Sequence, residues 1–489
     1  MRTYNYFWDL KGATAYSDCM IRSYASHTTF GGGMFKWVPI VGVVTDLPGI
    51  RIQPSANTNG YFERVMGNEI YADWFGPVHA NTTFAGASLS TPQASALYPT
   101  PVVTTPSDPA IPYTIADTDN IDWAALQAGI TYACNTKRPL LLGGADYYVN
   151  KSLYVNKFVG GSNVFTLDGG GAEIWTVNNN TFNILTRQSP NDQAQADSSM
   201  SNTRFDIKNL RMGSNGFGQT NQTGISLGPS YGAQYTNLLI AAHVQGIHLK
   251  FALNTTVNNV EFNLCRRGLV VDKGDWPGVT LSNAQSNVTT VNNCRAVMYG
   301  YSTNSYGYGF FDADGCSVNN SIVEGYFCEY GILFDTQASN WVYNFVVNNV
   351  HFECSPSGSP TGDGCVNSAI KIDALAGTYS IANIYGQHPC TLIDTEISGE
   401  TSIMVSGIYY WVPSVVDGSM FRNRTNNAGT WLFIGNAKNA LNDAAGLALK
   451  FSTNNGTGGP VGVVPTYLAS LVSENLGAGP YYRLMPTAS

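Results

Sequence analysis

Two short patterns of apolar and polar positions alternate through the middle of the chain. The first, called here the Asp phrase, runs through apolar residues and ends in Asp; its copies are Gly268–Asp272, Tyr308–Asp312, Gly331–Asp335, Ala369–Asp373 and Cys390–Asp394. The second, the Asn phrase, begins with an Asn pair; its copies are Asn258–Phe262, Asn292–Ala296, Asn319–Val323 and Asn348–Phe352. The copies recur every roughly 22 to 34 residues, a spacing that is typical of stacked repeats.

Each copy alternates in the manner of a short strand, whose neighbouring side chains point to opposite faces. The alternation directs one apolar set inward: Val260, Phe262, Val350 and Phe352 from the Asn phrase, and Leu269, Val271, Ile332, Phe334, Ile370 and Ile372 from the Asp phrase. One coil of such strands cannot bury its own apolar face, so the coils must stack. The sequence therefore predicts an all-β protein with a parallel β-helix.

The outward positions of the two phrases differ in character. In the Asn phrase they form two largely polar columns, Glu261/Arg295/Ile322/His351 and Asn263/Val297/Glu324/Glu353. In the Asp phrase the predicted outward column is mostly apolar: Val270, Phe310, Leu333, Lys371 and Leu392. An apolar stripe of this length is a liability on a monomer. We therefore expect identical chains to cover it by packing about a symmetry axis.

The polar residues that define the phrases are expected to be structural. An aligned column of Asp272, Asp312, Asp335, Asp373 and Asp394 would place carboxylates about 4.8 Å apart, where ionised groups repel one another. Acceptance of turn amide hydrogens at strand ends is favoured over calcium binding. The paired Asn residues predict an internal side-chain ladder at a turn.

Outside the repeats, composition divides the chain. Residues 1–77 contain short strand-like runs and are predicted to be an N-terminal head unit, and 78–116 form a Pro- and Thr-rich linker or surface arm. The β-helix is predicted over 117–412, closed by a helix at 122–133 whose cap is Asp119 or Asp122. Residues 413–489 lack both phrases and predict a small C-terminal β unit for trimerisation or receptor contact.

Composition narrows the function classes. The net charge of −8 and the lack of a Lys/Arg cluster argue against nucleic-acid binding. No apolar stretch is long enough to span a membrane, and Met1 to Gly12 contains no secretory signal pattern. The nine Cys are scattered and odd in number, which favours reduced, buried thiols and assembly in a reducing cytoplasm. No zinc spacing or phosphate loop is present, so no metal or cofactor is expected.

At this point an ordered set of motifs resembles a known family. Tyr61-Phe62-Glu63-Arg64-Val65 followed by Ala72-Asp73-Trp74-Phe75-Gly76 resembles the head of bacteriophage tailspikes and tail fibres that carry a pectate-lyase-like, right-handed parallel β-helix. The stretches Asp119–Ala128, Pro139–Val149 and Leu167–Ala172 are similar to the family's first helix and first coils. The resemblance covers roughly residues 60 to 400. It implies a homotrimer on the virion tail that attaches to other tail proteins through its N-terminal unit and engages a bacterial surface glycan.

Glu324 and Glu353 are the first candidate catalytic residues. They share an outward column on successive coils, so their backbones should lie about 5 Å apart, within reach of a retaining glycosidase pair. Two close carboxylates raise the pKa of one of them, which would give a general acid beside a nucleophile or base. The alternative is a pair of solvated surface carboxylates, bound to Arg295 or to another chain. His351 is a candidate base or substrate contact, and Arg295 a candidate substrate contact.

A second candidate region surrounds an aromatic segment with Tyr299, Tyr301, Tyr306 and Tyr308. Its tyrosines would form a platform for sugars, with Asp312 and Asp314 as further catalytic candidates and Glu329 as a substrate contact. The alternative is a Tyr-rich loop or a contact between chains.

Together these features predict a tailspike or tail fibre that binds a bacterial surface polysaccharide for host adsorption. The sequence leaves open whether the protein also depolymerises that polysaccharide. One alternative is a virion spike with a purely structural role, and another is a free bacterial polysaccharide lyase or hydrolase. A lyase requires a base beside a uronic acid, and the scarcity of basic residues on the candidate face argues against it.

Overall fold

The computed structural model describes residues 1–98, 114–155, 163–176, 182–187, 190, 193–214, 222–274, 276, 281, 284–299, 304–326, 328–336, 343–353, 365–387, 391–397, 401–411, 421–423, 430–439 and 451–453. The chain divides into two compact units, one of residues 1–189 and 201–226 and the other of residues 190–200 and 227–489. This boundary lies within the predicted coil region and not at the end of the predicted head.

The first unit begins with a small sheet in the order β1 (Arg2–Tyr6), β2 (Cys19–Ser23), β3 (Gly31–Pro39), β5 (Gly60–Arg64) and β4 (Arg51–Ile52). Arg64 ties this sheet together from within. Its guanidinium donates to the carbonyls of Gly49, Gly32 and Gly31 at 2.6, 2.7 and 2.7 Å and lies over the rings of Phe35 and Trp74. Burial lowers the pKa of Arg64 to about 9. The three carbonyl acceptors offset the desolvation cost of the buried guanidinium, which forms hydrogen bonds to backbone carbonyls in place of an ion pair with a carboxylate.

The segment that follows the sheet is packed within the first unit and is not the extended surface arm that the composition predicts. β6 (Ile70–Tyr71) and the 3₁₀-helix η2 (Ala72–Phe75) lead to α1 (Thr91–Leu97), which begins with a capping box between Ser90 and Gln93. Phe84 and Tyr98 are buried. The predicted linker is therefore wrong for residues 78–98, because buried aromatics anchor the Pro/Thr-rich sequence. Residues 99–113 lie outside the described residues.

The predicted helix is present as α2 (Ile121–Thr136), but neither predicted Asp caps it. Asn120 occupies the N-cap position. Asp119 accepts from Ala116 N at 2.7 Å and pairs with Lys151, while Asp122 is buried beneath the helix start. Parallel strands follow in three series. In the first, β10 (Asn163–Asp168) pairs with β7 (Leu140–Leu141) and β13 (Thr203–Ser214), and in the second, β11 (Glu173–Thr176) pairs with β8 (Asp146–Val149) and β13. In the third, β12 (Leu185–Thr186) pairs with β9 (Leu153–Tyr154) and β14 (Thr223–Leu227).

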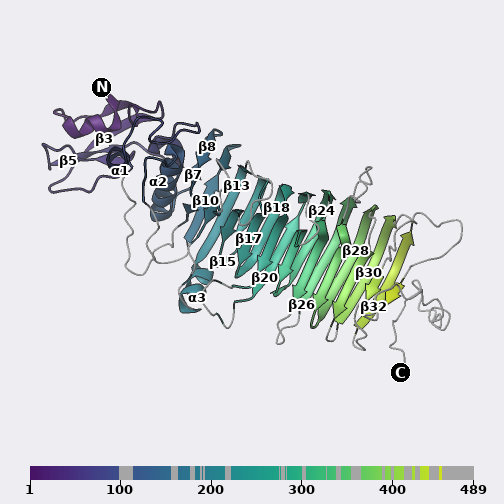
Figure 1. Cartoon of the computed structure of the whole chain (residues 1–489). Coiled ribbons are helices and arrows are strands. Elements are labelled where there is room, and N and C mark those ends of the chain that lie inside the picture. Colours follow the sequence, from purple (N-terminus) through teal and green to yellow (C-terminus); the bar gives the residue numbers. More distant parts are fainter. Residues whose placement is uncertain are drawn as a thin grey trace, which may run out of the picture. The chain divides into compact units, whose positions relative to one another are not determined.

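The second unit continues as stacked parallel strands in two sheets (Figure 1). The first sheet contains β15 (Ser230–Tyr231), β16 (Gln234–Ala241), β18 (Ala252–Cys265), β20 (Ser286–Asn292), β21 (Arg295–Tyr299), β23 (Ala313–Asp314), β24 (Cys316–Tyr326), β26 (Tyr343–Glu353), β28 (Gly377–Gln387), β30 (Thr401–Trp411) and β32 (Thr430–Asn439). The second contains β17 (Gln245–Lys250), β19 (Arg267–Asp272), β22 (Tyr306–Phe311), β25 (Cys328–Thr336), β27 (Cys365–Ala374), β29 (Thr391–Ile397), β31 (Phe421–Asn423) and β33 (Phe451–Thr453). A helix, α3 (Gln193–Asn202), precedes β13. The predicted parallel β-helix is confirmed.

The predicted inward residues form the core between the two sheets. All ten are at most 1% exposed: Val260, Phe262, Leu269, Val271, Ile332, Phe334, Val350, Phe352, Ile370 and Ile372. Like residues stack on successive coils, as in the rings of Phe310 and Phe334 at 5.3 Å and of Phe345 and Tyr379 at 5.3 Å. Six cysteines are buried outside any disulfide, as predicted for thiols that pack as small apolar residues: Cys19, Cys134, Cys265, Cys294, Cys316 and Cys328. Cys354 lies outside the described residues.

The Asn phrase makes a corner in the first sheet. The second Asn of each pair has a left-handed backbone, with φ of 54° at Asn259, 53° at Asn293, 48° at Asn320 and 54° at Asn349. Asn tolerates this conformation better than other residues that carry a Cβ. Side-chain amides link the corners, with Asn320 Nδ2 donating to Asn292 Oδ1 at 2.9 Å and Asn349 Nδ2 to Asn320 Oδ1 at 2.8 Å. The predicted ladder is present, but it is not internal, because the second Asn of each pair is exposed.

The Asp phrase does not keep the predicted register. Asp272 pairs with Phe311, and Phe311 with Asp335, so Asp312 falls one residue late. Asp394 pairs with Lys371, and Glu396 takes the place beside Asp373. The true outward column is Val270, Gly309, Leu333, Lys371 and Asp394.

The predicted exposed apolar stripe is therefore wrong. Phe310 points inward and is fully buried, and Val270 and Lys371 are each 3% exposed in the single chain. The buried column gives no support for a trimer, and the trimer stays a proposal. Of the predicted C-terminal unit, 413–489, only β31, β32 and β33 are described, and they continue the two sheets of the coil stack.

Candidate functional site

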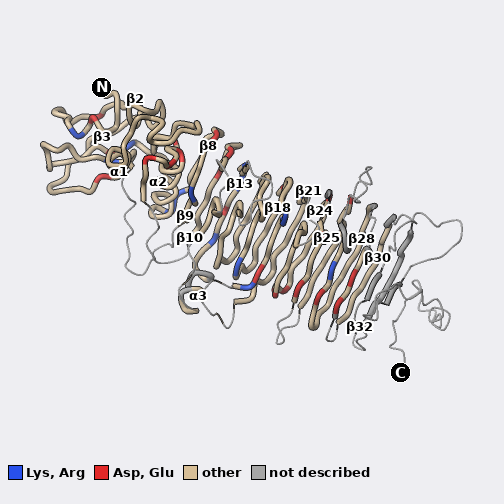
Figure 2. The backbone as a smooth tube through the Cα atoms, in the orientation of Figure 1, with Lys and Arg blue, Asp and Glu red and all other residues tan. Residues whose placement is uncertain are grey.

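The coils carry few charges, and most of the backbone in Figure 2 is neither acidic nor basic. One outward surface of the first sheet is an exception. It follows the Asn corner and consists of two adjacent columns; we call it the corner face. The first column holds Glu261, Arg295, Ile322, His351, Tyr385 and Tyr409, and the second holds Asn263, Val297, Glu324 and Glu353.

The register places Glu324 and Glu353 directly opposite each other on neighbouring strands β24 and β26. The corner fixes this alignment, because Asn319 pairs with Asn348 in the same ladder. Adjacent strands are about 4.8 Å apart, so the backbones of the two residues are direct neighbours on this face. The Glu324 side chain is 22% exposed and Glu353 is exposed.

Arg295 holds Glu324 in a two-pronged ion pair. Its Nε donates to Glu324 Oε1 at 3.1 Å and its Nη2 to Oε2 at 2.7 Å, while Nη1 lies 3.7 Å from Glu261 Oε1. The bond to Glu324, with the nearby charges of Glu324, Glu261 and Glu353, raises the pKa of Arg295. A bidentate guanidinium fixes both oxygens of the carboxylate that it binds. Glu324 is therefore held in place by Arg295, whereas Glu353 is exposed.

His351 begins an aromatic ladder on the same face. Its ring lies 4.9 Å from the ring of Tyr385, and Tyr385 stacks on Tyr409 at 5.7 Å with planes only 10° apart. Tyr385 is 55% exposed and Tyr409 is 45% exposed. Because the rings stack on each other, they present mainly their edges and hydroxyl groups to solvent. Such amphipathic side chains suit ligands that combine apolar C–H surfaces with hydroxyl groups.

Sequence reasoning missed Tyr385 and Tyr409. The available signal was Asn383, which has a φ of 54° and whose Nδ2 donates to Asn348 Oδ1 at 2.9 Å. The first Asn of this pair is replaced by Ala382, which hid this copy of the phrase. Extending the register by one further coil from Asn383 gives Tyr385 in the column of His351.

In the second candidate region, Tyr306 and Tyr308 are buried and do not form the predicted sugar platform. Tyr306 is 2% exposed, beneath Arg267 at 5.8 Å and beside Phe311 at 5.6 Å. Tyr308 is fully buried, and its hydroxyl donates to Ile322 O at 3.3 Å. The strand β22 is buried on both faces, so neither ring is available for stacking. Tyr301 lies outside the described residues.

The other predicted carboxylates serve local contacts. Asp312 is 7% exposed and accepts from Tyr343 Oη at 3.1 Å and Lys273 Nζ at 3.0 Å. Asp314 accepts from the backbone N–H groups of Gly315 and Asn344, each at 2.7 Å. Glu329 accepts from the backbone N–H of Asn304. Only Glu324, Glu353, His351 and Arg295 of the predicted set lie together on the corner face.

No group of three or more His, Cys, Asp or Glu side chains is arranged to hold a metal ion among the residues that the structure describes. Within the same residues, no helix is long and apolar enough to cross a membrane.

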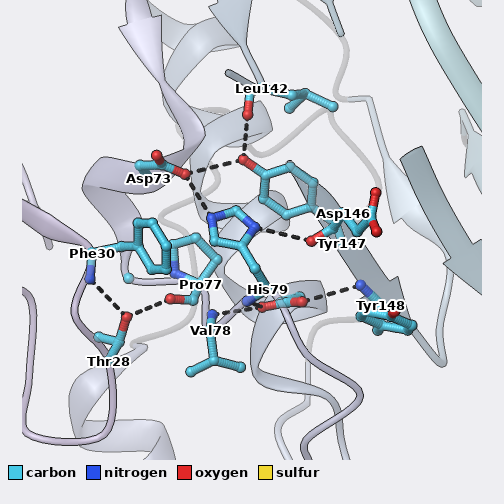
Figure 3. A network of polar contacts seen from close by, with 12 residues as sticks. Thr28, Phe30, Asp73, Pro77, Val78, His79, Leu142, Asp146, Tyr147 and Tyr148 are labelled. Carbon is cyan, nitrogen blue, oxygen red and sulfur yellow. Dashed lines mark hydrogen bonds and ion pairs between the residues drawn. The ribbon is translucent and has the colours of Figure 1, made fainter. Parts of the chain in front are cut away.

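A second polar cluster lies in the first unit and links η2 to β8 (Figure 3). His79 Nε2 lies 3.0 Å from Asp73 Oδ1, and Nδ1 lies 2.9 Å from the carbonyl of Asp146. Tyr147 Oη donates to Leu142 O at 2.6 Å and to the same Asp73 oxygen at 3.2 Å. Both ring nitrogens of His79 face acceptors, and only the cationic imidazole can donate from both. Burial lowers the pKa of His79, but the bonds to Asp73 and Asp146 outweigh it and raise the pKa overall.

Asp122 completes this cluster. Its Oδ1 accepts from the N–H groups of Val78 and His79 at 2.7 and 3.0 Å, and its Oδ2 from Tyr148 N at 3.1 Å. Burial raises the pKa of Asp122. Since both ring nitrogens and the backbone N–H of His79 are used in contacts within the protein, we interpret the cluster as a structural latch and not as a catalytic dyad.

Comparison with known proteins gives matches at the level of structure. No protein-family profile and no curated protein sequence matches the chain. The tailspike gp42 of Acinetobacter phage vb_AbaP_AS12 is similar with a TM-score of 0.49 and 13% identity, over 91% of this chain and 77% of that one. The tailspike of Acinetobacter phage vB_ApiP_P1 gives 0.42 and 14%, over 92% and 70%. A tailspike double mutant of Escherichia coli bacteriophage HK620, in complex with a pentasaccharide, gives 0.45 and 14%, over 84% and 68%.

Proposed function

We propose that this protein is a bacteriophage tailspike or tail fibre that binds a bacterial surface polysaccharide during host adsorption, and that the corner face is where the polysaccharide binds. The observation that carries the proposal is the corner face itself: a register-aligned carboxylate pair lies beside an exposed ladder of His351, Tyr385 and Tyr409. Carboxylates and tyrosine hydroxyls accept and donate hydrogen bonds to sugar hydroxyls, and ring edges contact sugar C–H groups. The elongated repeat gives a polymer several equivalent coils to lie along.

Cleavage of the glycan is the further step in this proposal. Glu353 would protonate the leaving oxygen, and Glu324, held in place by Arg295, would act as nucleophile or stabilise the developing positive charge. The short spacing of neighbouring coils corresponds to a retaining mechanism, because an inverting pair needs room for a water molecule between its carboxylates.

The proposal includes the assembly of the spike. The first unit, with its sheet and the hook at η2, would attach to other virion tail proteins, and the chains would associate as a homotrimer assembled in the bacterial cytoplasm. The buried free thiols of the described cysteines support folding in a reducing compartment. No cofactor and no nucleic-acid partner are part of the proposal.

The test is incubation of the full chain with purified capsule and lipopolysaccharide from candidate hosts, with binding measured by interferometry and released oligosaccharides by mass spectrometry. Glu324→Gln and Glu353→Gln should each lower the cleavage rate by at least about 100-fold, the usual loss for a general acid–base residue, while binding persists. Glu69→Gln, an exposed carboxylate in the first unit, is the matched control.

Binding without any released oligosaccharide would limit the function to adsorption. Full cleavage by both Gln variants would exclude this pair as the catalytic residues. No binding to any surface polysaccharide would reject the proposed function.

A further inference from the structure

The charges on the corner face restrict which polysaccharide it accepts. On the stretch of the two columns from Glu261 to Glu353, three carboxyl groups (Glu261, Glu324 and Glu353) accompany one guanidinium (Arg295), so that the formal charge is −2 with all three ionised and stays negative when Glu353 carries the proton that cleavage requires. A surface of one sign repels ligands of that sign and raises the local concentration of others. The arrangement disfavours any sugar that carries a carboxylate or phosphate.

Arg295 does not offset this exclusion. A substrate carboxylate is normally recognised by a bidentate guanidinium, but both prongs of Arg295 are occupied by Glu324, at 3.1 and 2.7 Å, and its remaining nitrogen is directed at Glu261 at 3.7 Å. An anionic sugar would have to displace an internal ion pair to reach it. Among the described residues of this stretch, Arg295 is the sole Lys or Arg.

The remaining groups on this face suit uncharged sugars. Tyr385 and Tyr409 present hydroxyl groups and ring edges, and His351 lies between them and the carboxylates in the adjoining column. Exposed carboxylates accept hydrogen bonds from sugar hydroxyls, and still more strongly from the ammonium group of an amino sugar.

We infer that the corner face selects a neutral or amino-sugar polysaccharide and excludes polysaccharides whose repeating unit carries a uronic acid or a phosphate. This inference rests on the proposed function, because it assigns a substrate class to the same face. It also favours hydrolysis over lyase chemistry, since a lyase acts on uronic acids.

The experiment compares each acidic polysaccharide with its own carboxyl-reduced form, in which the uronic acids have been converted to neutral sugars and the linkages are unchanged. The probes are capsular polysaccharides from candidate hosts, native and reduced, together with neutral O-polysaccharides. Binding to the full chain is measured at low and at physiological salt. We expect neutral or reduced probes to bind at least about tenfold more tightly than native acidic ones, and the difference to shrink as salt rises.

Glu261→Lys provides the sharper test, because Glu261 lies on the corner face outside the proposed catalytic pair. Reversing its charge should reduce the preference for neutral probes by about tenfold. Glu69→Lys changes the net charge of the chain equally but lies in the first unit, so it should leave the preference unchanged. Circular dichroism confirms that both variants are folded.

The outcomes separate the two proposals. Tighter binding of a native acidic probe than of its reduced form, or an unchanged preference in a folded Glu261→Lys variant, would overturn the selection for uncharged glycans and leave the adsorption function intact. Failure of every probe, neutral and acidic, to bind would reject the adsorption function, and the substrate class with it.

Discussion

The Asn phrase and the Asp phrase belong to the same coils, yet they behave differently. Asn258, Asn292, Asn319 and Asn348 pair with one another in unbroken register. The Asp residues of the other phrase do not, since Asp272 meets Phe311 and Asp394 meets Lys371. A left-handed corner with a side-chain ladder tolerates no shift, because a slip by one residue would put a different residue at positive φ and turn every side chain to the opposite face. A strand-terminal Asp has no such requirement.

The difference extends to the outer surfaces. The corner face is partly exposed and carries a charged and aromatic set, whereas the outward column of the second sheet is buried at Val270, Lys371 and Asp394. Residues that look alike in the sequence therefore have different energetic roles, and substitutions can distinguish them.

The largest losses of stability are expected in the core, where the inward residues of both phrases are equally buried. Phe334→Ala, from the Asp phrase, and Phe352→Ala, from the Asn phrase, should each lower the free energy of unfolding by about 4 kcal/mol, because each removes a fully buried ring from a stacked core. Chemical denaturation measures both. A loss below 1 kcal/mol at either site would mean that the two inner faces are not packed alike.

Removing one cation from each outer surface comes next. Lys371→Met should cost about 3 kcal/mol, because the Lys371 side chain is only 4% exposed and lies 3.0 Å from Glu396 and 4.0 Å from the fully buried Asp394. Arg295→Met should cost less than about 1 kcal/mol, because its side chain is 46% exposed. Equal losses in the two unfolding curves would remove the distinction between the surfaces.

The corner itself is tested by neighbouring Asn residues. Asn320→Ala should destabilise the protein by about 1 kcal/mol or more, because alanine is strained at a φ of 48° and the ladder bonds are lost. Asn320→Gly should cost less, since glycine adopts this conformation freely. Asn319→Ala is the matched control, because Asn319 Nδ2 donates within its own strand, to Ser317 Oγ at 3.1 Å, and not to the corner of a neighbouring coil. If Asn319→Ala is the more damaging change, backbone conformation does not fix the register.

The smallest effect concerns the latch at His79, which anchors the first coil by side-chain bonds as the Asn ladder anchors later coils. The pKa of His79 is raised above its ordinary 6.5, so its contribution is complete below that pH and is lost as the pH rises through the raised pKa. The stability difference between the wild type and His79→Asn should therefore shrink as the pH rises from below 6.5 through the raised pKa of His79. Thermal unfolding across this range measures it, and a difference that grows with pH would contradict the cationic assignment.

The sequence by itself determined the stacking and the corner. Alternating apolar residues identified the inward set, and the Asn pairs identified both the register of the first sheet and the alignment of Glu324 with Glu353. These features are local, because a strand alternates with a period of two and positive φ restricts the residue type at a single position.

Only the tertiary structure decided the rest. The register of the second sheet depends on how Phe310, Phe334 and Phe345 pack between the sheets, which no five-residue pattern contains. The burial of Tyr306 and Tyr308, the ion pair of Arg295 with Glu324, and the packing of residues 78–98 all depend on residues distant in the sequence. The stacking of Tyr385 on Tyr409 also depends on the tertiary structure. The two residues are 24 positions apart in the sequence and become neighbours only because β28 and β30 pair.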